Sequence, residues 1–121
     1  TAEPLTPTPG LALVIGSVGA LIMYFGTKML ENLGIDDVVG AIPVHMFAGI
    51  FGTLVVPISN NDTSFETQLI GTLSVCVFSF VLSYLAFLAL KATVGLRISK
   101  AAEKLGTDKS EIGVTAYSIR D

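Results

Sequence analysis

The chain has 121 residues, of which 51% are hydrophobic and 14% are charged, and its formal net charge is −3. Such a composition does not suit the water-facing surface of a soluble domain. The small net charge, with basic residues that are not interleaved with aromatic ones, argues against a nucleic-acid partner. Cys76 is the single cysteine, so the chain cannot form an internal disulfide or a thiolate metal cluster, and no cofactor is expected.

Fixed charges are absent from three separate stretches of 24 residues each, Pro4–Thr27, Val38–Asn61 and Thr67–Leu90. About 20 helical residues cross a hydrocarbon core of roughly 30 Å, so each stretch is long enough to span a bilayer. A lone strand or loop would leave backbone groups unpaired in lipid. We therefore predict an all-α integral membrane chain, with a transmembrane region over residues 1–96 and a tail over residues 97–121.

The first predicted span covers about residues 10–30. Three prolines precede it, and Pro9 suits the first turn of a helix because its missing N–H has no partner there. Residues 31–37 form a short polar turn. Its Asp36 and Asp37 stand where the next helix should begin, and acidic side chains at that position complement the positive end of the helix dipole.

The second predicted span covers about residues 38–58 and contains Pro43, which removes one intrahelical hydrogen bond and should make the start of this helix irregular. A polar loop follows. The third span is predicted over residues 67–96, and because it lacks an internal proline we expect it to be the longest helix, and tilted. Small residues at four-residue steps predict close helix packing, as at Ala12, Gly16 and Ala20 in the first span.

The orientation follows from the distribution of lysine and arginine. Four cations follow the body of the third span, namely Lys91, Arg97, Lys100 and Lys104. Neither the N-terminal segment nor the loop before the third span has any. By the positive-inside rule the tail is cytoplasmic, and we predict a multi-pass protein of the cell membrane whose Asp36–Asp37 turn also faces the cytoplasm.

His45 is the single histidine and the one titratable side chain placed well inside a predicted span. An ionisable group in lipid is unfavourable and marks a pathway or a proton relay, unless a neighbouring helix binds the neutral imidazole. Ala41 and Gly49 lie one turn away on the same face, leaving space for either a lumen or another helix. A lone histidine cannot form a metal site, and with no nucleophile and base in reach an enzyme is not expected.

Two parts of the sequence are similar to one known family. Residues 34–45 and 48–54, which include the Asp36–Asp37 pair and His45, resemble the tenth transmembrane helix of the Amt family of ammonium transporters. The tail resembles the cytoplasmic C-terminal region of that family. The residues that carry this second likeness include Gly95, Arg97, Gly106, Asp108 and Tyr117. The resemblance covers essentially the whole chain, as the last three of eleven helices and the tail.

The resemblance implies a homotrimer in which each subunit has its own narrow pore, lined by two hydrogen-bonded histidines. His45 matches the second of that pair, and Ala41 would face the same lumen. Ammonium would be deprotonated there and its proton relayed, which suits an imidazole because it accepts and donates hydrogen bonds near neutral pH. The first histidine belongs to a part of the family's sequence that this chain lacks, so the chain alone is expected to be incomplete.

The resemblance further implies a regulatory tail, and many bacterial members of the family bind a PII-type regulatory protein at the cytoplasmic face. We expect the tail beyond Arg97 to contact protein rather than lipid, through Leu105 and Tyr117, with turns at Gly106 and Gly113. Three residues depart from the family pattern: Gly40 replaces a frequent acidic residue, Pro43 a small one, and Ile112 a frequent histidine. Two alternatives stay open, an ammonium-sensing module fused to a signalling domain and a structural membrane subunit that does not transport.

Overall fold

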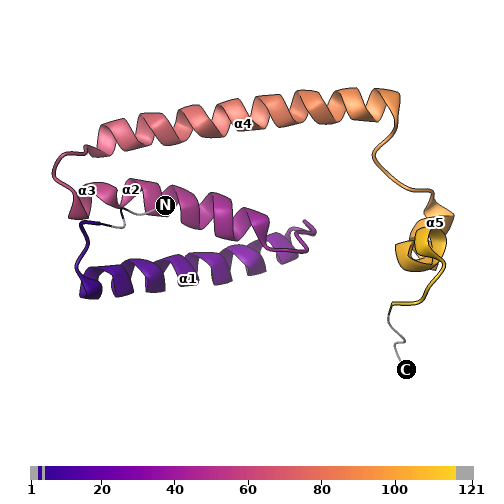
Figure 1. Ribbon diagram of the computed structural model, residues 1–121, viewed down its shortest axis with the longest axis horizontal. Coiled ribbons are helices and arrows are strands. Elements are labelled where there is room, and N and C mark those ends of the chain that lie inside the picture. The colour runs from indigo at the N-terminus through magenta and orange to yellow at the C-terminus, as the bar shows by residue number, and fades with distance from the viewer. Residues whose placement is uncertain (1–2, 4, 117–121) are drawn as a thin grey trace. The chain divides into compact units, whose positions relative to one another are not determined.

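The computed structural model describes residue 3 and residues 5–116, and these residues form helices and connecting loops without any strand (Figure 1). Three helical segments in this part of the chain are long and apolar enough to cross a membrane: Pro9–Asn32, Ile42–Ser59 and Phe65–Thr93. The prediction of an all-α chain with three membrane-spanning segments is therefore confirmed. The chain divides into two compact units, residues 1–79 and residues 80–121.

Helix α1 (Pro9–Asn32) begins as the sequence predicts, with Pro9 in its first turn. The side chain of Thr8 caps this end, because its hydroxyl oxygen accepts a hydrogen bond from the Leu11 N–H at 3.3 Å. At the other end, the Leu33 N–H bonds to carbonyls of the last turn. Of its 24 residues, the buried ones are Gly26 and Leu30, near the C-terminal end.

The second apolar segment is not one regular helix. A π-helical segment, η1 (Ile42–Phe47), continues into α2 (Ala48–Leu54) and then α3 (Val56–Ser59). The Ala48 N–H bonds to the carbonyl of Pro43, five residues earlier, which gives η1 its wide turn. The irregularity that Pro43 predicts is thus present. The predicted start at Val38 is wrong, because Val38 and Val39 lie in an exposed turn and helical backbone begins at Ala41.

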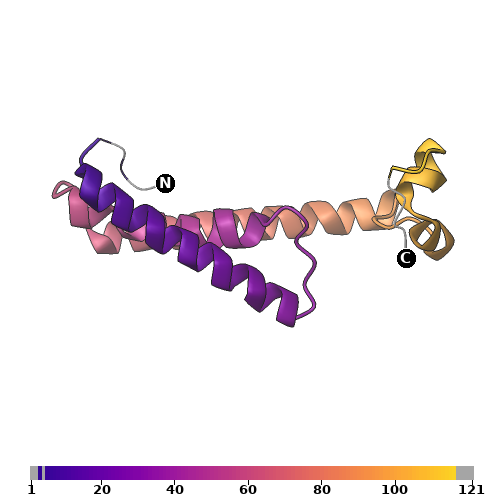
Figure 2. The ribbon, with the colours of Figure 1, turned by 90° about the horizontal axis from the view of Figure 1, so that it is seen from below.

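The backbone of α1 approaches η1 closely at Gly26, and α1 and α2 lie side by side (Figures 1 and 2). A Cβ atom on Gly26 would lie 2.7 Å from the Cδ2 atom of Phe47 and 3.0 Å from the Cβ atom of Pro43. Real Cβ atoms do not approach other carbon atoms so closely, so the contact requires glycine. Pro43 is fully buried there, and Leu30 is 5% exposed. This contact is the centre of packing in the first unit.

Helix α4 (Phe65–Thr93) is unbroken over 29 residues, which confirms that the third span is the longest helix. The Ser64 hydroxyl accepts a hydrogen bond from the Thr67 N–H at its start. The helix ends at Thr93, three residues before the predicted end of the span, where the N–H groups of Val94 and Gly95 both bond to the Leu90 carbonyl. None of the residues of α4 is buried. Its own side chains are apolar on all sides, as is typical of a helix in an apolar environment.

The tail contains α5 (Lys100–Leu105) and a second π-helical segment, η2 (Asp108–Ile112). Ser99 caps α5, because its hydroxyl oxygen accepts a hydrogen bond from the Ala102 N–H at 3.2 Å. Gly106 and Gly113 have φ values of 96° and 77°, so the turns predicted at these two positions are confirmed. Tyr117 lies outside the described residues.

The close contact at Gly26 gives a testable prediction. We expect Gly26→Ala to lower the free energy of unfolding by about 1–3 kcal/mol, because the new methyl group forces Phe47 or Pro43 to move. The control is Gly16→Ala in the same helix, where a Cβ atom meets nothing within 4 Å and alanine favours helix by about 0.5–1 kcal/mol. Denaturation of this chain in detergent micelles measures both, and equal effects of the two changes would contradict the packing described.

Candidate functional site

His45 lies in the middle of η1 with its side chain exposed. Pro43 and Phe47, two residues before and two residues after it, both turn toward Gly26 of α1. Residues two apart in a helix lie on nearly opposite sides, so the imidazole is on the face of η1 that points away from α1. In the part of the chain that the structure describes, the imidazole has no hydrogen bond or ion pair.

The level of His45 along the membrane normal can be estimated from α1. A helix of 24 residues is roughly 36 Å long, which exceeds a hydrocarbon core of about 30 Å by roughly 3 Å at each end. Gly26 lies six residues, or roughly 9 Å, before the end of α1. For an upright, centred α1, the Gly26 contact and His45 beside it are therefore roughly 6 Å inside the core.

The structure places His45 near the start of its helical segment, whereas the sequence placed it well inside a span. Helical backbone starts at Ala41, so the histidine is only one turn from the beginning of its helical segment. The sequence placed that beginning too early, because the apolar Val38 and Val39 belong to the preceding turn and not to the helix. For an upright, centred α1, His45 would still lie inside the apolar layer, closer to one surface than to the centre.

The other two residues predicted on this face, Ala41 and Gly49, are one turn before and one turn after His45. Ala41 is exposed, and a Cβ atom on Gly49 would meet nothing within 4 Å. The carbonyl of Gly49 accepts a hydrogen bond from the Thr53 hydroxyl at 3.0 Å. Gly52, by contrast, is buried, so the open side of the segment does not extend to a third turn.

Asp37 holds the start of η1. Its Oδ1 atom accepts a hydrogen bond from the Ala41 N–H at 2.9 Å, and its Oδ2 atom accepts one from the Ile42 N–H at 2.7 Å. These N–H groups belong to the first turn, where no helical carbonyl is available to them. Both bonds involve a charged acceptor beside the positive end of the helix, which strengthens them. Asp36 is exposed, and the described residues give its side chain no such bond.

A hollow of about 280 Å³ lies beside this turn, between the end of α1 and the start of η1. Its polar lining comes from Thr27, Glu31, Asp36 and Asp37, and Leu30 and Pro43 close its apolar side. His45 and Ala41 do not line it, because they lie on the other face of η1. The hollow and the predicted lumen are therefore two different places.

In the tail, Asp108 organises the chain around itself. Its Oδ2 atom accepts a hydrogen bond from the Ala116 N–H at 2.8 Å, eight residues further on. This bond, with a second from the Lys109 N–H, lowers the pKa of Asp108 below its ordinary value, so the carboxylate is ionised. Gly106 lies against it, and a Cβ atom there would be 2.5 Å from Oδ1 of Asp108. Two of the predicted tail residues thus form one turn.

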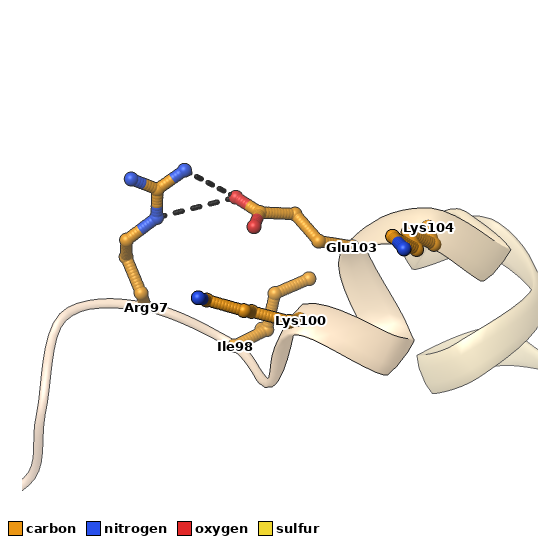
Figure 3. A pocket seen from close by; sticks show the side chains of 5 residues that line it. All are labelled: Arg97, Ile98, Lys100, Glu103 and Lys104. Atoms are coloured by element: carbon orange, nitrogen blue, oxygen red, sulfur yellow. Dashed lines mark hydrogen bonds and ion pairs between the residues drawn. The ribbon is translucent and has the colours of Figure 1, made fainter.

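Arg97 forms an ion pair with Glu103, six residues further on, and its Nε atom donates to Oε1 of Glu103 at 3.2 Å. The hydrogen bond and charge of Glu103 raise the pKa of Arg97. Figure 3 shows the two side chains reaching toward each other at a hollow of about 550 Å³. Its lining consists of Arg97, Ile98, Lys100, Glu103 and Lys104. Gly95, with a φ of 82°, ends the helix just before this segment.

Sequence reasoning missed two of these features. Gly26 lies outside the four-residue series of small residues, although it follows Gly19 by seven residues, a spacing that places both on one helix face. The pairing of Arg97 with Glu103 joins the connecting segment to α5, whose start is capped by Ser99. A serine followed by a short run of helix-forming residues could have indicated that cap.

Comparison with known proteins identifies relatives over most of the chain. The profile of the Ammonium Transporter Family matches residues 1–117. A putative ammonium transporter of Synechocystis is 36% identical over 89% of this chain and 25% of its own length. The ammonium transporter Amt2 of Archaeoglobus fulgidus is 33% identical over 90% of this chain and 28% of its own. The ammonium transporter Amt1 of Methanocaldococcus jannaschii is 32% identical over 92% of this chain and 30% of its own length. The chain thus spans between a quarter and a third of the length of these relatives.

The cap formed by Asp37 leads to a prediction with a matched control. We expect Asp37→Ala to lower the free energy of unfolding by about 1 kcal/mol, because two N–H groups at the start of η1 lose their acceptor. Asp36→Ala removes the same charge from the neighbouring position but breaks no hydrogen bond, so we expect less than half that effect. Thermal unfolding of the two variants in detergent compares them. If both lose the same stability, charge and not capping is responsible.

Proposed function

The chain belongs to the ammonium transporter family, and from that premise we propose that it forms part of the wall of a pore that carries ammonium across the cell membrane. The proposal concerns the complete protein, because the chain spans only 25–30% of the first three relatives. Three helices long and apolar enough to span a bilayer fit this role. The role is transport and not catalysis of a covalent reaction.

The observation that carries the proposal is the exposed imidazole of His45. It lies on the face of η1 that points away from α1. For an upright, centred α1, this level is roughly 6 Å inside the hydrocarbon core. A polar group without a hydrogen bond in an apolar medium is unfavourable by roughly 1–3 kcal/mol or more. In the complete transporter His45 therefore faces water or a polar partner, and the proposed partner is a second histidine outside this chain.

The proposed mechanism separates ammonium into ammonia and a proton. A bare cation in an apolar lumen is strongly unfavourable, whereas neutral ammonia is not. Ammonium gives one proton to the histidine pair, ammonia crosses, and the proton passes along the imidazoles and recombines with ammonia on the other side. Imidazole suits this relay because one ring nitrogen donates while the other accepts. The small side chains at Ala41 and Gly49 leave room for the lumen beside it.

The surrounding protein forms the rest of the proposal. The tail faces the cytoplasm, as the cations from Lys91 to Lys104 support by the positive-inside rule. Three copies assemble as a homotrimer in the lipid bilayer. A PII-type regulatory protein contacts the cytoplasmic face, and Leu105, an exposed apolar residue of the tail, offers it a contact. The turns at Gly106 and Asp108 hold that part of the tail in one conformation.

The experiment replaces His45 in the full-length transporter, reconstituted in liposomes. We expect His45→Ala and His45→Asn both to lower the ammonium-driven proton current by at least about tenfold, because asparagine keeps hydrogen bonds but cannot carry a proton. The control is Val77→Ala, at an exposed apolar position of α4, which should transport as the unmodified protein does. Unchanged current and unchanged discrimination against potassium in His45→Ala would disprove the relay.

A further inference from the structure

A basic hollow follows α4 in the second unit. It is lined by Arg97 in the connecting segment, by Lys100 and Lys104 on α5, and by Ile98 and Glu103. The two lysines are four residues apart and therefore lie on one face of α5. In Figure 3 the side chain of Lys100 extends from the first turn of α5 toward the side on which Arg97 lies. All three cations therefore line one hollow, with Lys104 further along α5 than Lys100.

The charges of this hollow are not balanced within the described part of the chain. Glu103 is its one carboxylate and is paired with Arg97. Three cations and one carboxylate leave a net charge of two positive units. Neither Lys100 nor Lys104 has an ion-pair partner among the described residues. The surface is therefore electrically complementary to an anion.

The position of the hollow identifies where such an anion comes from. Arg97 is four residues beyond the end of α4, and four residues of extended chain reach at most about 14 Å. The polar headgroup layer begins where the hydrocarbon core ends, and long cationic side chains extend into it readily. If α4 spans the bilayer, the hollow lies at or near the headgroups.

The segment that joins α4 to the hollow is apolar. Val94 is 79% exposed and Leu96 is 48% exposed, and Ile98 continues this alternation into the hollow itself. Apolar side chains beside cations are typical of a chain that rests on a membrane surface, where the hydrocarbon boundary and anionic headgroups are adjacent. A free phosphate ion has no apolar group and would gain no binding energy from these apolar side chains.

From the charge of this hollow and its apolar approach, we propose that Arg97, Lys100 and Lys104 bind the phosphate group of an anionic phospholipid in the leaflet next to the tail. The proposal rests on the proposed spanning of the membrane by α4 and not on ammonium transport. The sequence led us to expect that the tail beyond Arg97 contacts protein rather than lipid. Under this proposal the tail contacts lipid as far as Lys104, and the protein contact begins at Leu105. The bound headgroup fixes α5, and with it the start of the tail, against the membrane.

The test measures lipid binding by the full-length transporter with native mass spectrometry in detergent. Phosphatidylglycerol and the uncharged phosphatidylcholine are titrated separately. Each cation near an anionic surface contributes about fivefold in affinity, so we expect Lys100→Gln with Lys104→Gln to weaken phosphatidylglycerol binding by about 25-fold. Glu103→Gln removes the one repulsive carboxylate and should strengthen binding by about fivefold. Lys109→Gln, a tail lysine outside the hollow, is the control and should change nothing.

Three results would overturn the proposal. Equal binding of phosphatidylglycerol by the double variant and the unmodified protein would assign the cations to a protein partner. Equal loss in Lys109→Gln would show a general charge effect without a site. Displacement of the lipid by the same concentration of soluble glycerol 3-phosphate would assign the hollow to free phosphoesters. Because no arm of the experiment reads ammonium flux, a failure here is distinguishable from a failure of the proposed transport.

Discussion

The contact between Gly26 and the Pro43–Phe47 pair is the constraint on which the first unit depends. It brings the backbone of α1 against η1 so closely that a single methyl group would not fit. Pro43 and Phe47 fill the space that the glycine leaves, and Leu30 is buried next to them. Because these two side chains face α1, His45 between them must face the other way. The direction of the His45 side chain is thus a consequence of helix packing.

The irregular start of the second span depends on the same residues. Pro43 has no N–H to donate, so it is tolerated only in the first turn of a helix, and the turn that follows it is wide. Asp37 supplies the acceptors that this first turn lacks. A π-helical turn carries His45, and such turns are frequently found at functional sites. The irregular part of the second apolar segment is thus the part that carries the histidine.

The sequence predicted much of this architecture because charge is a clear signal in a membrane protein. Three uncharged stretches predicted three spanning helices, and Pro9 and Pro43 predicted a helix start and an irregular turn, all of which the structure contains. Helix ends were less predictable. Val38 is as apolar as any residue in a span. It lies in a turn just before the helix whose first N–H groups donate to the Asp37 carboxylate, and hydropathy does not encode these hydrogen bonds.

The candidate site was predicted only in part, for a physical reason. His45 was identified because an ionisable side chain is rare in an apolar stretch. The direction in which His45 faces and its position along the membrane normal were not predicted, because both depend on contacts with α1 that no local sequence pattern contains. The same holds for Arg97, whose ion-pair partner Glu103 lies six residues further on, in α5. Local composition predicts which residues are unusual, while packing decides what they face.

If His45 belongs to the wall of a pore, as proposed, the His45 face of η1 is accessible to water and the opposite face, which packs against α1, is not. Cysteine accessibility measures this most directly, with single cysteines introduced along η1 in a cysteine-free full-length transporter and a small cationic thiol reagent added from solution. We expect fast reaction at positions 41, 45 and 49, and slow reaction at positions 43 and 47, which face α1. Fast reaction at 43 and 47 with protection of 45 would contradict it.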